Sequence, residues 1–131
     1  MDKAQLAEDL QKAVPGLCLR IDEPMCNHTS FRIGGPADLM IWPASIGELQ
    51  QVLRLLKGHQ VPVYIMGNGS NLLVRDGGFR GVIIKLAENF SQITVEGTRL
   101  RAQVGASLAK LANEACRAGL GGLEFASGIP G

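Results

Sequence analysis

The sequence predicts an α+β fold, and three observations carry that prediction. First, a helical pattern over residues 45–58 lies between two apolar segments typical of strands, residues 37–42 and residues 61–66, the second of which we expect to be buried. A helical connection between two strands of one sheet makes them parallel, so these segments predict a parallel β-α-β unit. Second, a glycine-rich loop follows the second strand. Third, alternation around a glycine turn over residues 93–104 predicts a hairpin ahead of a last helix.

The N-terminal region predicts a peripheral helix and then an edge strand. Asp2 is a candidate N-cap, and Pro15 and Gly16 end the helical pattern. The mixed pattern of residues 17–25 fits a strand at the edge of a sheet. The apolar face of the helix is expected to hold Leu6, Leu10, Ala13 and Val14.

The central helix has clear signals at both ends. Ser45 and Glu48 form a capping-box pattern at its start, and Gly58 is expected to be its C-terminal residue. Beyond the glycine-rich loop, residues 75–78 predict a turn and residues 81–86 predict another strand. The predicted apolar face of the helix consists of Ile46, Leu49, Val52, Leu53 and Leu56.

The C-terminal third begins with the hairpin, whose expected strands are residues 93–96 and 100–104. A helix is expected over residues 107–118, ending at Gly119. Residues 121–131 have no regular period. Because chains normally finish in solvated segments, this apolar, glycine-rich end predicts a chain cut short. The residues expected to be buried on the last helix are Leu108, Leu111, Ala112, Ala115 and Cys116.

Composition and charge disfavour several classes of function. The 131 residues suit one domain, and 46% hydrophobic content is enough for a core. A formal net charge of +1, without a run of like charges, disfavours nucleic-acid binding. No apolar stretch has transmembrane length or the form of a signal peptide, so we expect no membrane insertion and a cytoplasmic location. Cys18, Cys26 and Cys116 are too irregularly spaced for a disulfide framework or a zinc site, which favours buried or incidental thiols.

The glycine-rich loop has the chemistry of a phosphate site. In residues 67–71, Gly-Asn-Gly-Ser-Asn, two glycines allow consecutive backbone N–H groups to face one anion, and Ser70 and Asn71 add donors. The loop lacks the third glycine and the helix of a dinucleotide-binding fingerprint, and it lacks the Gly-Lys-Ser/Thr of a P-loop. The residues alone leave two interpretations open: a phosphate-binding loop, or a glycine-rich turn between two buried strands.

Residues 27–36, Asn-His-Thr-Ser-Phe-Arg-Ile-Gly-Gly-Pro, form a second polar segment. Its small side-chain donors fit either a turn network or the wall of a ligand site, and the residue chemistry favours the turn network. We expect His28 to be a hydrogen-bonding loop histidine rather than a catalytic base, because nothing near it forms a nucleophile-base pair.

Three blocks of sequence stand out along the chain: residues 27–38, residues 67–74 and residues 122–131. With these blocks the chain strongly resembles the UDP-N-acetylenolpyruvoylglucosamine reductase family. The middle block is shared more loosely with other flavoproteins, whereas the outer two are far more specific to the reductases. The resemblance implies the first part of a vanillyl-alcohol-oxidase-type (PCMH-type) FAD-binding domain. It divides the chain into an N-terminal helix and extension, residues 1–26, and an incomplete FAD-binding domain, residues 27–131, with the substrate domain absent.

The same resemblance implies a function. Members of the family are oxidoreductases that bind FAD, use NADPH as co-substrate and convert UDP-N-acetylglucosamine enolpyruvate to UDP-N-acetylmuramate. This step belongs to peptidoglycan synthesis, and through it to cell wall biogenesis, cell shape and cell division. By resemblance the cofactor-binding residues are Gly67, Asn68, Gly69, Ser70, Asn71 and Leu72, which wrap the FAD pyrophosphate, together with Gly128, Ile129, Pro130 and Gly131.

The resemblance also sets limits. Gln103 and Val104 stand where small residues are common in the family, which argues against a close backbone approach to FAD at Gln103, while Gly105 keeps its place. The family's catalytic serine, arginine and glutamate lie beyond the position that matches Gly131. We therefore assign no catalytic residue and expect the isolated chain to be inactive.

Two further expectations concern partners and alternatives. The apolar residues 120–129 have no partner in the chain, so we expect either self-association as a dimer or a disordered tail. Two alternative functions stay open. One is part of an FAD-linked oxidase of the same superfamily, which should lack the block at residues 27–38, and the other is a self-standing nucleotide-binding module without catalysis.

Overall fold

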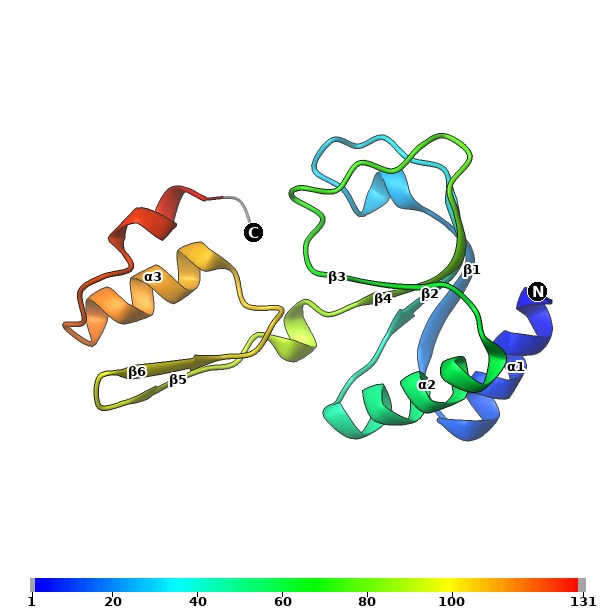
Figure 1. The fold of residues 1–131 in the computed structure, drawn as a ribbon, viewed down its shortest axis with the longest axis horizontal. Helices are drawn as coiled ribbons and strands as arrows, with labels where there is room; N and C mark the ends of the chain where they lie inside the picture. The colour runs from blue at the N-terminus through cyan, green and yellow to red at the C-terminus, as the bar shows by residue number, and fades with distance from the viewer. Residues whose placement is uncertain (1, 130–131) are drawn as a thin grey trace.

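The structure is a computed structural model that describes residues 2–129, and within these residues the chain forms two units (Figure 1). The first unit is a four-stranded sheet with two helices, and the second is a hairpin with one helix. The elements in chain order are α1 (Lys3–Ala13), β1 (Cys18–Pro24), η1 (Met25–Asn27), β2 (Pro36–Trp42), α2 (Ile46–His59), β3 (Val63–Met66), β4 (Phe79–Lys85), η2 (Glu88–Phe90), β5 (Ile93–Glu96), β6 (Arg99–Ala102), α3 (Leu108–Arg117) and η3 (Glu124–Gly128).

The sheet of the first unit has the strand order β1-β2-β4-β3. Strands β2, β4 and β3 run parallel, and β1 lies at the edge, antiparallel to β2. The predicted edge strand and the parallel β-α-β unit are therefore confirmed, although β4 lies between the two strands of that unit. Residues 67–78 return the chain from β3 to β4 without a helix, and Val74 of this loop packs against the sheet.

Each face of the sheet carries its own apolar core. Helices α1 and α2 cover one face (Figure 1), and the second face is covered by loops. The helix-side core is formed by Leu6, Ala7, Leu10, Val14, Leu17, Leu39, Ile41, Val52, Leu56, Val82, Ile84, Leu86 and Phe90. The loop-side core is formed by Met25, Ala37, Met40, Met66, Val74 and Ile83.

The helix caps follow the sequence signals with one exception. The Asp2 side chain accepts a hydrogen bond from the N–H of Gln5, and the Ser45 side chain accepts one from the N–H of Glu48. The prediction that α2 ends at Gly58 is wrong: the helix continues to His59, and Gln60 is its C-cap with φ of 54°. A helix tolerates an interior glycine at modest cost, and Gln60 itself adopts the left-handed conformation that ends the helix.

Burial differs from the expectation at four places. Ile46, expected on the apolar face of α2, is 59% exposed in the first turn of the helix. The buried face of α1 consists of Leu6, Ala7 and Leu10, and the C-cap Val14 is buried as well. Ala13 lies outside this face and is exposed. Cys116 is likewise exposed on the flank of α3. Strand β3 is not buried as predicted, because it lies at the open edge of the sheet. Its Tyr64 and Ile65 are 44% and 48% exposed, and within the strand Met66 is buried.

The second unit confirms the predicted hairpin and last helix. Strands β5 and β6 pair antiparallel, and β6 ends two residues earlier than expected, at Ala102. Ser107 caps α3, and Gly119 follows the helix with φ of 71°. Figure 1 shows this unit set apart from the sheet and joined to it through the end of β4 and η2, with η3 against α3. Among residues 2–129, no helix is long and apolar enough to cross a membrane.

We predict that Leu10→Ala destabilises the chain by about 2–5 kcal/mol, because Leu10 is fully buried between α1 and the sheet. Leu73→Ala is the matched control, since Leu73 is 66% exposed, and it should change stability by no more than about 0.5 kcal/mol. Urea denaturation of both variants measures the difference. Equal, small effects would mean that α1 does not belong to the core.

Candidate functional site

The candidate site lies where the three parallel strands end. Trp42 ends β2, Met66 ends β3 and Lys85 ends β4. Met66 and Lys85 are register partners, and the N–H of Leu86 donates to the carbonyl of Met66 at 2.8 Å. The glycine-rich loop starts at the next residue, Gly67, so it lies at the carboxyl edge of the sheet, as predicted. Ligands of open α/β sheets bind at this edge.

The two glycines of the loop have different structural roles. Gly69 is buried with φ of 73°, and a Cβ added to it would lie 2.0 Å from the carbonyl oxygen of His28. The Ser30 N–H donates to the Gly69 carbonyl at 3.2 Å. The Cα of Gly69 thus faces protein, and the chain itself requires a glycine there. At Gly67, by contrast, an added Cβ would meet no protein atom closer than 3.9 Å, so packing within the chain does not explain that glycine.

The polar segment at residues 27–36 forms the predicted turn network. The N–H of His28 donates to the carbonyl of Met25 at 2.9 Å, and the N–H of Arg32 donates to the carbonyl of Thr29 at 3.1 Å. The Thr29 hydroxyl donates to the carbonyl of Ile33. Since Ser30 also bonds to the glycine-rich loop, the turn network supports that loop from one side.

A second contact binds the block at residues 27–38 to the end of the same loop. The N–H of Gly35 donates to the carbonyl of Arg75 at 2.9 Å, and a Cβ on Gly35 would lie 2.0 Å from the carbonyl oxygen of Asp76. The buried Asp38 carboxylate forms an ion pair with Arg80 at 3.0 Å. Backbone atoms of residues 27–38 thus contact residues 67–78 at two places, near Gly69 and at Arg75 and Asp76.

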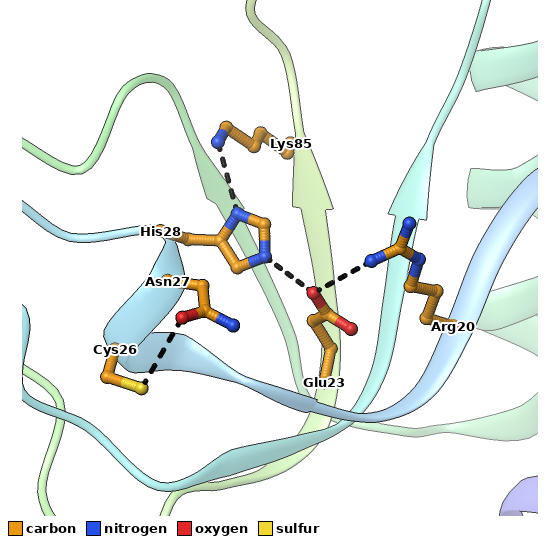
Figure 2. A network of polar contacts seen from close by, with 6 residues as sticks. All are labelled: Arg20, Glu23, Cys26, Asn27, His28 and Lys85. Atoms are coloured by element: carbon orange, nitrogen blue, oxygen red, sulfur yellow. Dashed lines mark hydrogen bonds and ion pairs between the residues drawn. The ribbon is translucent and has the colours of Figure 1, made fainter.

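His28 connects charged groups of β1 with Lys85 at the end of β4 (Figure 2). Its Nε2–H donates to the buried carboxylate of Glu23 at 2.9 Å, and its Nδ1 accepts from the Lys85 ammonium at 3.2 Å. Arg20 pairs with the same Glu23 oxygen at 3.3 Å and lies over the ring of Trp42 at 5.7 Å. The expectation of a hydrogen-bonding loop histidine is confirmed. Sequence reasoning missed Glu23, which lies in a mixed segment and carries no signal, and Lys85, whose only signal is a charge after an apolar strand pattern.

A cavity of about 320 Å³ opens beside this network. Of the predicted loop residues, Asn68 lines it, whereas Ser70 is half-buried and Asn71 exposed elsewhere on the loop. The full lining is Trp42, Asn68, Lys85, Ala87, Glu88 and Asn89. Backbone N–H groups, amide side chains and one ammonium are the donor set that an anionic phosphate requires.

The second predicted flavin segment lies on the other unit. Gly128 ends η3 and Ile129 is 44% exposed, while Pro130 and Gly131 lie outside the described residues. Hydrogen bonds from the backbone N–H groups of Glu124 itself and of Gly122 lower the pKa of the Glu124 carboxyl. The segment is therefore held by its own turn.

Gln103 and Gly105 act at the junction of the two units. The Gln103 side chain accepts from the N–H of Gln92 at 3.0 Å, and the N–H of Gly105 donates to the carbonyl of Phe90 at 2.7 Å. A Cβ on Gly105 would lie 2.4 Å from the carbonyl of Ala87. Glycine at this position is thus required for packing against the turn after β4.

Three parallel strands with a glycine-rich loop at their carboxyl edge form an arrangement that binds nucleotides in open α/β sheets. The family model described as "FAD binding domain" matches residues 37–131. The chain belongs to this FAD-binding domain family, and the predicted fold class is confirmed.

Particular relatives refine the comparison. The UDP-N-acetylenolpyruvoylglucosamine reductase of Alkaliphilus oremlandii is 48% identical over 131 residues, which is all of this chain and 43% of that protein. The reductase of the same name from Clostridium botulinum strain Hall is 56% identical over 111 residues, covering 85% of this chain and 36% of that protein. The chain therefore spans less than half the length of the curated relatives it matches.

Solved structures give the same picture of the fold. The UDP-N-acetylenolpyruvylglucosamine reductase from Thermus caldophilus superposes with a TM-score of 0.64 at 33% identity, covering 87% of this chain and 38% of that one. The 4-ethylphenol oxidase from Gulosibacter chungangensis superposes with a TM-score of 0.65 at 16% identity, covering 88% and 24%. At that identity the second likeness shows the fold alone.

We predict that Gly69→Ala destabilises the chain more than Gly97→Ala does. Both glycines have φ near 70°, at 73° and 63°, but an added Cβ meets nothing within 4 Å at Gly97. The strained backbone should cost about 1–2 kcal/mol at Gly97. At Gly69 the overlap with His28 should raise the total to about 2–5 kcal/mol. Urea denaturation compares the two variants, and an amide shift change at Ser30 in Gly69→Ala identifies the contact. An equal loss of stability in the two variants would contradict the role of the Gly69–His28 contact.

Proposed function

We propose that the chain is the FAD-binding portion of an NADPH-dependent reductase that converts UDP-N-acetylglucosamine enolpyruvate to UDP-N-acetylmuramate in bacterial peptidoglycan synthesis. Within it, residues 67–72 bind the FAD pyrophosphate, and residues 128–131 form a second flavin contact. The proposal assigns the whole protein a nucleotide-sugar substrate and a cytoplasmic location. No catalytic residue is assigned within the chain.

The observation that carries the proposal is the block at residues 27–38 and its contact with the glycine-rich loop. This block is far more specific to the reductases than the loop is, and it holds the loop through Ser30 and Gly35. Relatives named as reductases match the chain at 48–56% identity, whereas the 4-ethylphenol oxidase structure matches at 16%. This difference in identity supports the reductase over the oxidase.

The residues present fit a flavin dinucleotide. The loop at the end of β3 offers the backbone N–H groups of its residues, open space beside the Cα of Gly67, and amide and hydroxyl donors in Asn68 and Ser70. When bound, the flavin supplies the hydride-transfer chemistry. This chain's own residues contribute binding and orientation at the pyrophosphate end.

An FAD-linked oxidase is the second candidate, favoured by one observation. The TM-score of 0.65 for the 4-ethylphenol oxidase is as high as the TM-score of 0.64 for the Thermus caldophilus reductase. The backbone alone therefore does not separate the two activities. The sequence of residues 27–38 separates them, because it is expected in the reductases and not in the oxidases.

We predict that the full-length protein containing this chain binds FAD and oxidises NADPH when the enolpyruvyl nucleotide sugar is present, whereas the 131-residue chain does not turn over. FAD binding is measured by flavin fluorescence, and turnover by NADPH absorbance with a no-substrate control. Peroxide production from a phenol or alcohol without NADPH would support the oxidase instead. Failure of the full-length protein to bind FAD would reject both and leave a module of another kind.

Self-association is a separate proposal for the isolated chain. Phe125 and Ile129 are 72% and 44% exposed on η3 and beside it, and burying such apolar surface stabilises a dimer by about 25 cal/mol per Å². We predict that light scattering over a dilution series shows a dimer for this chain and a monomer for the chain ending at Gly119. Two monomers would contradict the proposal.

A further inference from the structure

We propose that Lys85, held in place by His28, is a phosphate-binding residue of this site and supplies the cation for the diphosphate of the flavin dinucleotide. This inference rests on the proposed FAD-binding function. It concerns a residue outside the glycine-rich loop, on a strand that the loop does not follow directly. The single observation behind it is a half-buried ammonium that faces the cavity at the start of the loop.

The register of the sheet places Lys85 next to the loop. Lys85 is the partner of Met66, the last residue before Gly67, and both lie on parallel strands that end at the same edge. Lys85 lines the same cavity as Asn68 of the loop. The register and the shared cavity thus place Lys85 beside the first residues of the loop.

The charge of Lys85 is not balanced by a carboxylate. Within residues 2–129, Lys85 forms no ion pair, whereas the half-buried Lys3 pairs with Asp22. Its one hydrogen-bond partner is Nδ1 of His28 at 3.2 Å. Removing an ammonium from water is costly unless an anion or a full set of acceptors replaces the water. The unmatched charge therefore points to a ligand that carries negative charge.

His28 fixes the direction of the ammonium. Because Glu23 is buried and accepts from Nε2–H at 2.9 Å, the His28 ring turns Nδ1 toward Lys85. Nδ1 then accepts one of the three N–H donors of Lys85, and the other two have no hydrogen-bond partner among the described residues. The carboxylate behind the ring favours this arrangement without contacting Lys85 itself. His28 is a positioning residue, and Lys85 is the one that would contact the ligand.

Glu88 is the acidic residue that lines the same cavity. It is exposed and forms no ion pair with Lys85 among the described residues. Its negative charge opposes an anion in this cavity. Glu88→Gln should accordingly leave FAD binding unchanged or tighten it.

The test measures FAD affinity of the full-length protein, freed of flavin, by fluorescence titration at several salt concentrations. Lys85→Gln should weaken FAD binding by about 10- to 100-fold, the effect of losing one hydrogen bond to a charged group. It should also flatten the salt dependence of the dissociation constant, since one charge pair is lost. Lys85→Arg should keep the FAD affinity within about 10-fold of the wild-type value, and it should keep the wild-type salt dependence. Lys57→Gln, which removes an exposed lysine at the end of α2 and gives the same net charge, is the matched control.

The variant His28→Leu distinguishes the positioning role of His28 from the effect of the Lys85 charge. It removes the acceptor for Lys85 but leaves the ammonium, so FAD affinity should fall less than in Lys85→Gln, and the salt dependence should stay as in the wild type. Circular dichroism melting of each variant shows whether the fold is kept. If Lys85→Gln does not fold, a comparison of the FAD affinities of Lys85→Met and Lys85→Arg tests the charge at this position instead.

The outcomes distinguish the inference from the function on which it rests. Wild-type protein that binds no FAD would reject the proposed function. If Lys85→Gln binds FAD as tightly as the wild type, or if Lys57→Gln weakens FAD binding to the same extent, the role of Lys85 is rejected. The proposed function is then unaffected. A parallel titration with NADPH identifies the source of the phosphate: a loss confined to NADPH would overturn the assignment to the flavin.

Discussion

The contact between Gly69 and the backbone of His28 is the constraint on which the site depends. The Ser30 N–H holds the Gly69 carbonyl at 3.2 Å, and no side chain fits between Gly69 and His28. The glycine-rich loop is therefore shaped by protein contacts and does not need a ligand to adopt its turn. A loop that is ordered in advance loses less entropy on binding, which leaves more of the interaction energy for affinity.

The glycines of this region divide into two kinds when each is compared with its surroundings. Gly35, Gly69 and Gly105 are required by backbone atoms that approach within 2.0–2.4 Å of an added Cβ. Gly67 has no such neighbour, so its missing side chain leaves space on the ligand side. A short glycine pattern in a sequence thus combines structural and binding requirements. Only the packed structure separates them.

Much of the fold follows from local signals, while the site depends on contacts between distant residues. The caps at Asp2 and Ser45 and the hairpin are confirmed because each is determined within a few residues. The end of α2 and the burial of β3 were wrong, since Gln60 and the open sheet edge are set by tertiary context. The approach of Lys85 to His28 joins positions 57 residues apart. Neither periodicity nor spacing could indicate that pair.

The block at residues 27–38 acts on the site through structure. It supplies the carbonyl that packs on Gly69, the N–H of Gly35 that fixes the loop's far end, and the imidazole that orients Lys85. None of these contacts transfers a proton or an electron. The part of this block in the described structure is therefore to shape the glycine-rich loop and to set the direction of a charged side chain beside it.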